Sequence, residues 1–274
     1  MTVHPSLQTY ADASTHSLES IAELVQPLVE GEWNRPTPCP AWSVRDVVSH
    51  VIGMECEMLG DPRPIHTLPR DLYHVKSDFA RYMEMQVDVR RHHTAPEMTS
   101  ELEYTMIRRA RQLRNETRGP DAVVRAPLGA EQTLELAMRM RAFDLWVHEQ
   151  DLRAAIGRPG NEDSPGAYIT RDCLLEALPK TVAKDAGAPP NSAVVFDVHG
   201  PVEFLRTVRV DADGRGTVDG APSLGPVVTL AMDWETYHRL ACGRMRATAA
   251  VDRVKVDGDQ DLATAILREF AVTP

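Results

Sequence analysis

Asp144-Leu145-Trp146-Val147-His148-Glu149-Gln150-Asp151 is the stretch that decides how this chain of 274 residues is interpreted. It belongs to a helical pattern that runs from about Leu134 to Ile156 and ends at Gly157. Asp144 and His148 are four residues apart, so a helix places both side chains on one face, one turn apart. Helical bundles build metal sites from side chains on facing helices. The stretch therefore predicts half of a metal site on a bundle helix.

The other half is predicted by a histidine far upstream. His50 ends the stretch Trp42-Ser43-Val44-Arg45-Asp46-Val47-Val48-Ser49-His50, which has apolar residues at helical spacing. Ser43 is a good N-cap, and Asp46 stands where a capping box has Glu. Together, His50, Asp144 and His148 supply two imidazoles and one carboxylate. Three protein ligands leave a zinc-like ion an open position for water or substrate, so the set predicts a catalytic metal site.

The first half of the chain reads as a helical bundle. Further helical patterns cover about 10–29, 77–91 and 97–118, and the prolines of Arg35-Pro36-Thr37-Pro38-Cys39-Pro40 exclude a helix before Trp42. An extended piece at 122–128 precedes the last helix. We expect an all-helical domain with four main helices over residues 1–158. Cys39 is interpreted as a small residue that fills the proline turn, in preference to a reactive thiol.

The composition changes after Gly157-Arg158-Pro159-Gly160. One helical pattern, 170–184, is followed by β-branched runs at 193–198, 204–210, 216–218 and 227–230, with turn signals between them. This pattern predicts a meander of antiparallel strands. Asp233 caps a further helix, and a strand near 254–256 and a helix over 261–270 follow. The fold class expected is therefore α+β, with a smaller second domain over residues 159–274.

Charge and hydropathy restrict the class of protein. The net charge is −10, which argues against non-specific binding of nucleic acid. No run of about 18 apolar residues predicts a membrane helix, and the N-terminus lacks the features of a signal peptide. We expect a cytoplasmic protein that binds neither nucleic acid nor membrane. The four cysteines are scattered and are expected to be free thiols.

Simpler interpretations of the same residues stay open. A histidine such as His50, beside an apolar stripe, is most often packed in a core, and an acid four residues before a histidine is often only a local contact. Asp151 is one turn beyond His148 and is expected to accept a hydrogen bond from its imidazole, with direct metal ligation as the alternative. Glu149 and Gln150 are expected to face solvent. His92-His93 diverges by about 100° on a helix, which makes a poor chelate.

Two motifs resemble a known family. They are similar to the two signatures of the mycothiol-dependent maleylpyruvate isomerase family. The first motif is Pro36-Thr37-Pro38-Cys39-Pro40-Ala41-Trp42-Ser43-Val44-Arg45-Asp46-Val47-Val48-Ser49-His50, and the second is Asp144-Leu145-Trp146-Val147-His148-Glu149-Gln150-Asp151-Leu152-Arg153. That family belongs to the DinB-like metal-binding four-helix bundles. The resemblance implies a divalent metal, often zinc, on His50, Asp144 and His148. The family more often has Glu where this chain has Asp144, whose carboxylate reaches one methylene less far.

The second half resembles the C-terminal domain of the same family, which is similar to the sterol-carrier-protein-2 (SCP2-like) fold. The stretches that carry this resemblance are Thr229-Leu230-Ala231-Met232-Asp233-Trp234-Glu235-Thr236-Tyr237, Cys242-Gly243-Arg244 and Val254-Lys255-Val256-Asp257-Gly258-Asp259. The family is typical of actinobacteria, in which mycothiol is the main small thiol. The arginine-rich, lysine-poor composition fits a high-GC bacterial genome.

The resemblance implies an enzyme that presents mycothiol as a thiolate to an electrophilic small molecule. Metal coordination deprotonates a thiol, and the thiolate is the nucleophile. S-transfer is the reaction we expect first; cis–trans isomerisation and a non-catalytic metal or ligand binder are the alternatives. Arg91, Arg141 and Arg153 are the candidates for holding mycothiol, each against the simpler reading of a surface arginine. The protein is expected to be a monomer or a homodimer.

Overall fold

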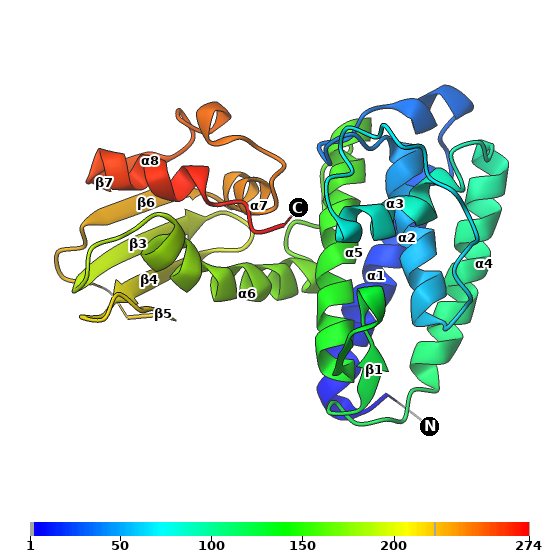
Figure 1. Ribbon diagram of the computed structural model, residues 1–274, viewed down its shortest axis with the longest axis horizontal. Coiled ribbons are helices and arrows are strands. Elements are labelled where there is room, and N and C mark those ends of the chain that lie inside the picture. Colours follow the sequence, from blue (N-terminus) through cyan, green and yellow to red (C-terminus); the bar gives the residue numbers. More distant parts are fainter. Residues whose placement is uncertain (1–2, 222, 274) are drawn as a thin grey trace. The chain divides into compact units, whose positions relative to one another are not determined.

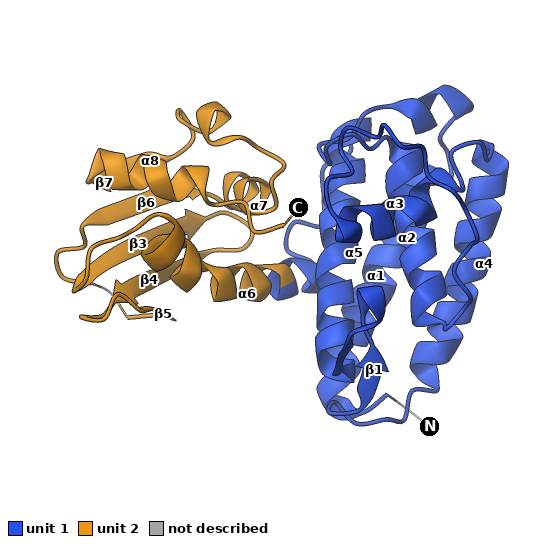
Figure 2. Ribbon diagram, viewed as in Figure 1, with its two compact units in different colours: residues 1–169 blue, residues 170–274 orange. Residues whose placement is uncertain are grey.

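The computed structural model describes residues 3–221 and 223–273. The chain divides into two compact units, residues 1–169 and 170–274 (Figure 2). The sequence analysis placed the boundary after Arg158, whereas the compact units divide within α6 (Pro165–Lys180). The start of α6 belongs to the first unit because it packs closely on the bundle. A Cβ added to Gly166 would lie 2.9 Å from Cβ of Trp146.

The first unit is built from long helices that run side by side (Figure 1). Its helices are α1 (Gln8–Val25), α2 (Val44–Met58), α3 (Asp78–Asp88), α4 (Ala95–Arg114) and α5 (Leu134–Ile156), with 3-10 turns at Pro5–Leu7, Glu30–Asn34 and Pro127–Gly129. α1 packs along α5, and α2 packs against α3, α4 and α5. Their apolar faces enclose a main core, which includes Ile21, Leu24, Val47, Val51, Met98, Leu102 and Leu145, and a smaller cluster lies around Leu7, Leu113 and Met138.

Local sequence signals fix the ends of the two helices that carry the predicted ligands. At the start of α2, Ser43 Oγ accepts the backbone N–H of Asp46, and Asp46 accepts the backbone N–H of Ser43 at 2.9 Å. Asp therefore completes the capping box in place of Glu. Thr133 caps α5, which ends at Gly157 in the left-handed region at φ 67°, as expected of a helix C-terminus.

One expectation about the first half was incomplete. The extended piece forms a hairpin in which β1 (Val123–Arg125) pairs antiparallel with β2 (Glu131–Thr133), so the unit is not all-helical. The sequence signal was weak because the second strand has only three residues and leads directly into α5. The four main helices predicted for the bundle are α1, α2, α4 and α5, with the shorter α3 beside them.

The second unit contains a five-stranded sheet in the order β5-β4-β3-β6-β7. Its strands are β3 (Ser192–His199), β4 (Phe204–Val210), β5 (Gly216–Asp219), β6 (Val228–Asp233) and β7 (Lys255–Gly258). The helices are α6, which continues into a π-helical turn at Thr181–Asp185, α7 (Trp234–Ala241) and α8 (Gln260–Arg268); a 3-10 turn spans Ala247–Ala249. The predicted fold class, a helical bundle followed by an α+β domain, is confirmed.

The pairing of one strand differs from the predicted meander. β3, β4 and β5 pair antiparallel in sequence order, but β6 returns to the other side of β3 and pairs with it in parallel. β7 then pairs antiparallel with β6. Alternation and turn residues indicate where strands begin and end, but they do not encode which neighbour a strand selects. The expectation of a continuous meander was therefore wrong at β6.

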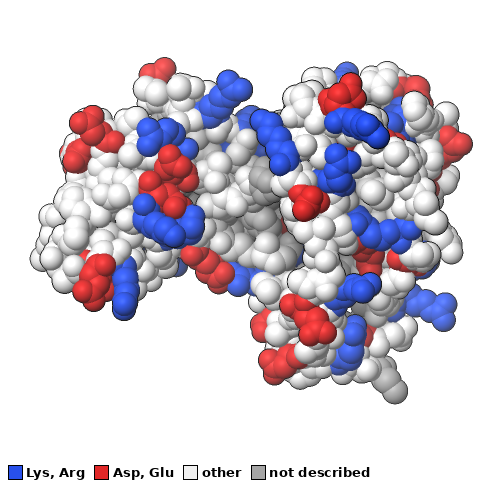
Figure 3. All heavy atoms as spheres, in the orientation of Figure 1, with Lys and Arg blue, Asp and Glu red and all other residues white. Residues whose placement is uncertain are grey.

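The surface agrees with the composition. On the face shown in Figure 3, acidic and basic side chains are interspersed, and no extended basic area gathers on that face. Among the described residues, no helix has both the length and the hydropathy needed to cross a bilayer.

Candidate metal centre

The three predicted ligands meet in the first unit. His50 comes from α2, and Asp144 and His148 come from α5. Nε2 of His50 lies 3.3 Å from Oδ2 of Asp144, and Nε2 of His148 lies 3.5 Å from Oδ1 of the same carboxylate. The donor atoms of all three residues lie within 4.8 Å of one another. Both histidines are buried, whereas about a third of the Asp144 side chain is accessible (34%). The three candidate ligands are therefore accessible to solvent only on the side of Asp144.

The remaining nitrogen of His148 has a partner of its own. Nδ1 of His148 lies 3.0 Å from Oδ2 of Asp151, whose side chain is 2% exposed. An ionised Asp151 carboxylate can only accept a hydrogen bond, so it holds the imidazole proton of His148 on Nδ1. The other ring nitrogen, Nε2, is then directed at Asp144. This is the contact that the sequence analysis expected of Asp151. Nδ1 of His50, in contrast, is buried and has no hydrogen-bond partner.

Burial and charge act differently on the two imidazoles. Burial lowers the pKa of His50 below its ordinary value, and the attraction of Asp144 does not compensate. Burial opposes protonation of His148 too, but the two carboxylates beside it, Asp144 and Asp151, outweigh burial and raise its pKa. The difference follows from the number of carboxylates each ring faces. Burial alone would raise the pKa of Asp144, but the histidines and Arg141 hold it well below its ordinary value.

A buried arginine orients the carboxylate of the set. Arg141 donates from Nη1 to Oδ2 of Asp144, from Nε to Glu55 at 2.5 Å, and from Nη2 to the carbonyl of Val51 at 3.1 Å. Glu55 also accepts from Nε of Arg109 at 2.7 Å. The side chains of Arg141, Glu55 and Arg109 are at most 5% exposed. Arg141 is thus a buried residue beside the predicted metal ligands, and the simpler interpretation of it as a surface arginine is wrong.

The aromatic ring of Trp42 packs against both histidines of the candidate metal centre. Its ring centroid lies 5.1 Å from that of His50 and 5.8 Å from that of His148, and the two imidazoles are 4.8 Å apart. Nε1 of Trp42 donates to Oε2 of Glu84 in α3 at 3.1 Å. A large apolar ring excludes water from the faces of the imidazoles that it covers.

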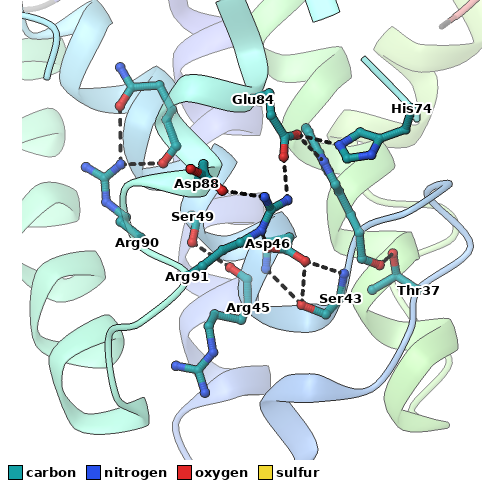
Figure 4. A network of polar contacts seen from close by, with 12 residues as sticks. Thr37, Ser43, Arg45, Asp46, Ser49, His74, Glu84, Asp88, Arg90 and Arg91 are labelled. Atoms are coloured by element: carbon teal, nitrogen blue, oxygen red, sulfur yellow. Dashed lines mark hydrogen bonds and ion pairs between the residues drawn. The ribbon is translucent and has the colours of Figure 1, made fainter. Parts of the chain in front are cut away.

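The other two arginines are held by carboxylates. Arg91 contacts Asp46 at 3.1 Å, Asp88 at 2.6 Å and Glu84, as Figure 4 shows. Arg153 donates to Glu149 at 2.9 Å and to Ser20 Oγ at 2.8 Å. Both guanidinium groups therefore have protein partners. Contact of either with a bound thiol stays a prediction.

Glu149 corrects one expectation. It was expected to face solvent, but it is fully buried, and its Oε1 accepts from Ser20 at 2.7 Å and from Nδ2 of Asn161 at 2.7 Å as well as from Arg153. The reason is that α5 packs against α1, α2 and the β1–β2 hairpin, so Oε1 of Glu149 finds internal partners instead of water, whereas its Oε2 is buried without a hydrogen-bond partner. Gln150 is half-buried and donates to the carbonyl of Gly160.

A second donor group shares His148. Cys39, His148 and Asp151 are all buried, and one donor atom of each lies within 4.8 Å of the others. Cys39 is 8% exposed and packs in the bundle core. Its sulfur therefore lies close to the outer hydrogen bond of the predicted metal site. His92 is exposed and His93 pairs with Glu101 at 3.5 Å, so this histidine pair lies in a separate contact.

The donor set fits a divalent cation. His50, Asp144 and His148 offer two imidazole nitrogens and a carboxylate, the ligand types of catalytic zinc sites. The low pKa of Asp144 and the low pKa of His50 keep both in the deprotonated forms that bind metal. His148 has the outer hydrogen bond that orients a metal-binding imidazole.

Sequence reasoning missed several supporting residues. Trp42 was quoted as part of a motif, but its contact with both histidines was not foreseen. Glu84 and Glu55 carry no local signal, because a lone acidic residue in an amphipathic helix is ordinarily solvated. Only the tertiary contacts of α2 with α3, α4 and α5 reveal their partners.

Fold and donor set together define a class: a helical bundle with a three-ligand candidate metal site, joined to an α+β domain. Residues 15–153 match the family model described as mycothiol maleylpyruvate isomerase N-terminal domain, and residues 169–265 match the model described as MDMPI C-terminal domain. The chain belongs to the mycothiol-dependent maleylpyruvate isomerase family. No curated protein matches the chain.

Solved structures share the fold. The crystal structure of the mycothiol-dependent maleylpyruvate isomerase is similar with a TM-score of 0.56 at 14% identity, over 94% of this chain and 96% of that chain. A mutant of that enzyme gives the same values. Sterol Carrier Protein 2 Like 2 from Aedes aegypti aligns with 37% of this chain and 96% of its own, at 17% identity and a TM-score of 0.30. At 14% identity, the likeness to the isomerase concerns the fold alone.

Proposed function

We propose that this protein is a metal- and mycothiol-dependent cis–trans isomerase of the maleylpyruvate type. The observation that carries the proposal is the convergence of His50, Asp144 and His148 within 4.8 Å in a chain whose two halves match the two domains of that family. From the sequence we expected S-transfer first. The family match supports isomerisation better, so we place it first.

The accessible side of the donor set is where a thiol would bind. A divalent cation on these residues would lower the pKa of a coordinated thiol, so that the sulfur is a thiolate at neutral pH. Zinc is the ion we expect. Three protein ligands and a partly exposed Asp144 leave room for one further donor.

The chain's own residues prepare this site. Asp151 holds the proton on Nδ1 of His148, so that Nε2 keeps its lone pair for the metal. Arg141 fixes the carboxylate of Asp144 and compensates its charge. Trp42 covers the imidazole rings and keeps water from them. Ligands that are fixed before binding do not need to reorganise during the reaction.

The isomerase reaction returns its thiol. The thiolate sulfur adds to one carbon of a conjugated cis double bond, and the electron pair of that bond moves onto the neighbouring carbonyl group. Rotation follows about the resulting single bond. The electron pair then returns, the carbon–sulfur bond breaks, and the trans isomer and the thiolate leave. No oxidant, reductant or net proton is needed.

The thiol balance separates isomerisation from S-transfer. The zinc-loaded protein is incubated with maleylpyruvate and mycothiol at one tenth of the substrate concentration, and the products are followed by NMR and mass spectrometry. We expect conversion of all the substrate to the trans isomer, with the mycothiol recovered unchanged. Consumption of one thiol per product, with a carbon–sulfur adduct, would instead establish an S-transferase.

A non-catalytic binder is distinguished by the same experiment. A binder would retain the thiol or another ligand without converting substrate. Glutathione in place of mycothiol is the specificity control, because the sugar and inositol groups of mycothiol are expected to supply positioning contacts. Arg91, Arg141 and Arg153 are the residues that we propose for these contacts, and Arg141 is the one that lies beside the metal ligands.

A further inference from the structure

We propose that Glu84 is a positioning residue of the metal centre and acts through Trp42. The proposal rests on the metal site of the proposed function. Glu84 lies on α3, a helix that supplies none of the proposed metal ligands. Its role would be to hold the Trp42 ring against the imidazoles of His50 and His148.

Trp42 is placed where its orientation matters. Its ring is tilted by 37° to His50 and by 34° to His148, with centroid distances of 5.1 and 5.8 Å. One ring thus packs on two imidazoles that come from different helices. Rotation of Trp42 about its side-chain bonds would remove the contact with both rings at once. The imidazoles could then tilt away from Asp144.

Glu84 provides the polar contact that fixes this rotation. Its side chain is 1% exposed, and its Oε2 accepts from Nε1 of Trp42 at 3.1 Å. The carboxylate also contacts Nε2 of His74 at 3.0 Å and Arg91 (Figure 4). Its charge is therefore compensated and its position is fixed from two sides. Removing this acceptor would leave the partly buried indole N–H of Trp42 without its protein partner, which is unfavourable.

The backbone before Trp42 shows the same constraint. Ala41 has φ 67°, in the left-handed region that non-glycine residues avoid. Such a backbone conformation is unfavourable and persists only where its surroundings fix it. Here the carbonyl of Trp42 accepts from the backbone N–H of Thr37 at 3.0 Å and from its hydroxyl at 2.8 Å. The hydrogen bonds of the turn therefore fix the backbone of Trp42, and the hydrogen bond to Glu84 fixes its ring.

The packing of α3 on α2 makes the contact possible. Gly53 of α2 faces Gln86 of α3, and a Cβ added to Gly53 would lie 2.4 Å from Cβ of Gln86. The glycine allows the two helices to approach closely. Glu84 is two residues from Gln86 and lies on the same short helix. The close approach fixes the position of α3 beside α2, and the carboxylate of Glu84 accepts from Trp42 in this arrangement.

The test compares three variants. Glu84→Leu removes the acceptor and leaves Nε1–H of Trp42 unpaired, whereas Glu84→Gln keeps an acceptor oxygen without the charge. Asp88→Asn is the matched control, because Asp88 lies on the same helix and contacts Arg91 and His66 but not Trp42. In the apo-protein, the indole N–H resonance of Trp42, assigned with Trp42→Phe, is expected to shift strongly in Glu84→Leu and to stay near its parent position in Asp88→Asn.

Cobalt(II) reports the metal centre directly. We expect Glu84→Leu to lower cobalt affinity about 10–100-fold and to change the d–d spectrum at full occupancy. Glu84→Gln should restore most of both properties, and Asp88→Asn should retain them. In the Trp42→Phe background, Glu84→Leu should cause no further loss, because the route through the indole N–H is already absent.

The outcomes separate this inference from the proposed function. If the parent protein binds no cobalt, the metal centre itself is wrong. If the parent binds cobalt and Glu84→Leu, folded by circular dichroism, keeps the parent affinity and spectrum, the positioning role of Glu84 is overturned. Equal losses in Glu84→Leu and Asp88→Asn would overturn it too, because the effect would then come from the Arg91 network and not from Trp42.

Discussion

Nδ1 of His148 and Oδ2 of Asp151 lie 3.0 Å apart within one turn of α5, and both side chains are buried. This pair determines which nitrogen of His148 faces Asp144 and His50. In the proposed metal centre, the Asp151 carboxylate would hold the imidazole proton on Nδ1, and Nε2 would then be free to bind the metal. The same helix therefore supplies two of the proposed metal ligands and the group that would orient one of them.

Asp151 and Asp144 should differ in how severely their loss affects the metal. Asp151→Asn removes an outer hydrogen-bond acceptor and is expected to lower zinc affinity about 10–100-fold. Asp144→Asn removes a ligand and should lower it further. Competition titration with a zinc-binding dye measures both. The opposite order of severity would make Asp151 the ligand and give Asp144 the supporting role.

His50→Ala and His148→Ala should each lose the metal while the bundle stays folded. The reason is that the apolar core formed by α1, α2, α4 and α5 does not depend on the imidazoles. Metal content is measured by mass spectrometry after dialysis, and folding by circular dichroism. His93→Ala, in a separate contact with Glu101, is the control and should keep its metal. Full occupancy in both site variants would refute the assigned ligands.

Glu55 should make the stability of the first unit depend on pH. Burial alone would raise the pKa of Glu55, but Arg141 and Arg109 outweigh it and lower that pKa below the ordinary 4.5. The folded state thus favours the ionised form. This contribution to the free energy of unfolding is complete above about pH 4.5 and is lost as the pH falls through the lowered pKa.

Glu55→Gln tests this expectation. Removing the carboxylate leaves buried guanidinium charge uncompensated, which is expected to cost about 3–5 kcal/mol at pH 7. Urea unfolding at pH 7 and at pH 4 should show a smaller acid dependence than in the parent protein. Asp61→Asn, which removes a partly exposed pair with Arg108, should cost about 1 kcal/mol or less. Equal costs for the two variants would contradict the buried role of Glu55.

The sequence predicted what local patterns encode. The helix ends at Ser43 and Gly157 follow from capping chemistry, and the placement of Asp144 and His148 on one face follows from the helical repeat. The arrival of His50 at the same place required only that α2 and α5 pack together. These features are set by residues a few positions apart or by an apolar face that must be buried.

The features that the sequence did not predict are those that depend on contacts between residues far apart in the chain. The direction of β6 beside β3 and the burial of Glu149 are decided by elements far away in the chain. The roles of Glu84 and Glu55 are of the same kind, since each meets a side chain 42 to 86 residues away. Arg141 was named as a possible thiol contact, but its burial beside Asp144 was visible only in three dimensions.

Cys39 should be dispensable for the reaction. Its thiol lies near His148 and Asp151, but the proposed nucleophile is the sulfur of mycothiol. Cys39→Ser and Cys39→Ala are therefore expected to keep their zinc and to lose activity only modestly, through packing. Metal content and turnover are measured on the same preparations. A Cys39→Ala protein that keeps its metal and shows no turnover would favour a cysteine nucleophile in the protein.

The central claim is that the metal on His50, Asp144 and His148 receives the sulfur of mycothiol. Titration of the cobalt(II)-loaded protein with mycothiol tests it most directly, because sulfur ligation produces a sulfur-to-cobalt charge-transfer absorption in the near ultraviolet. We expect this band to grow with added mycothiol and to saturate at one thiol per metal. His148→Ala should not show it. A cobalt-loaded protein that turns over substrate while mycothiol leaves its spectrum unchanged would contradict the account.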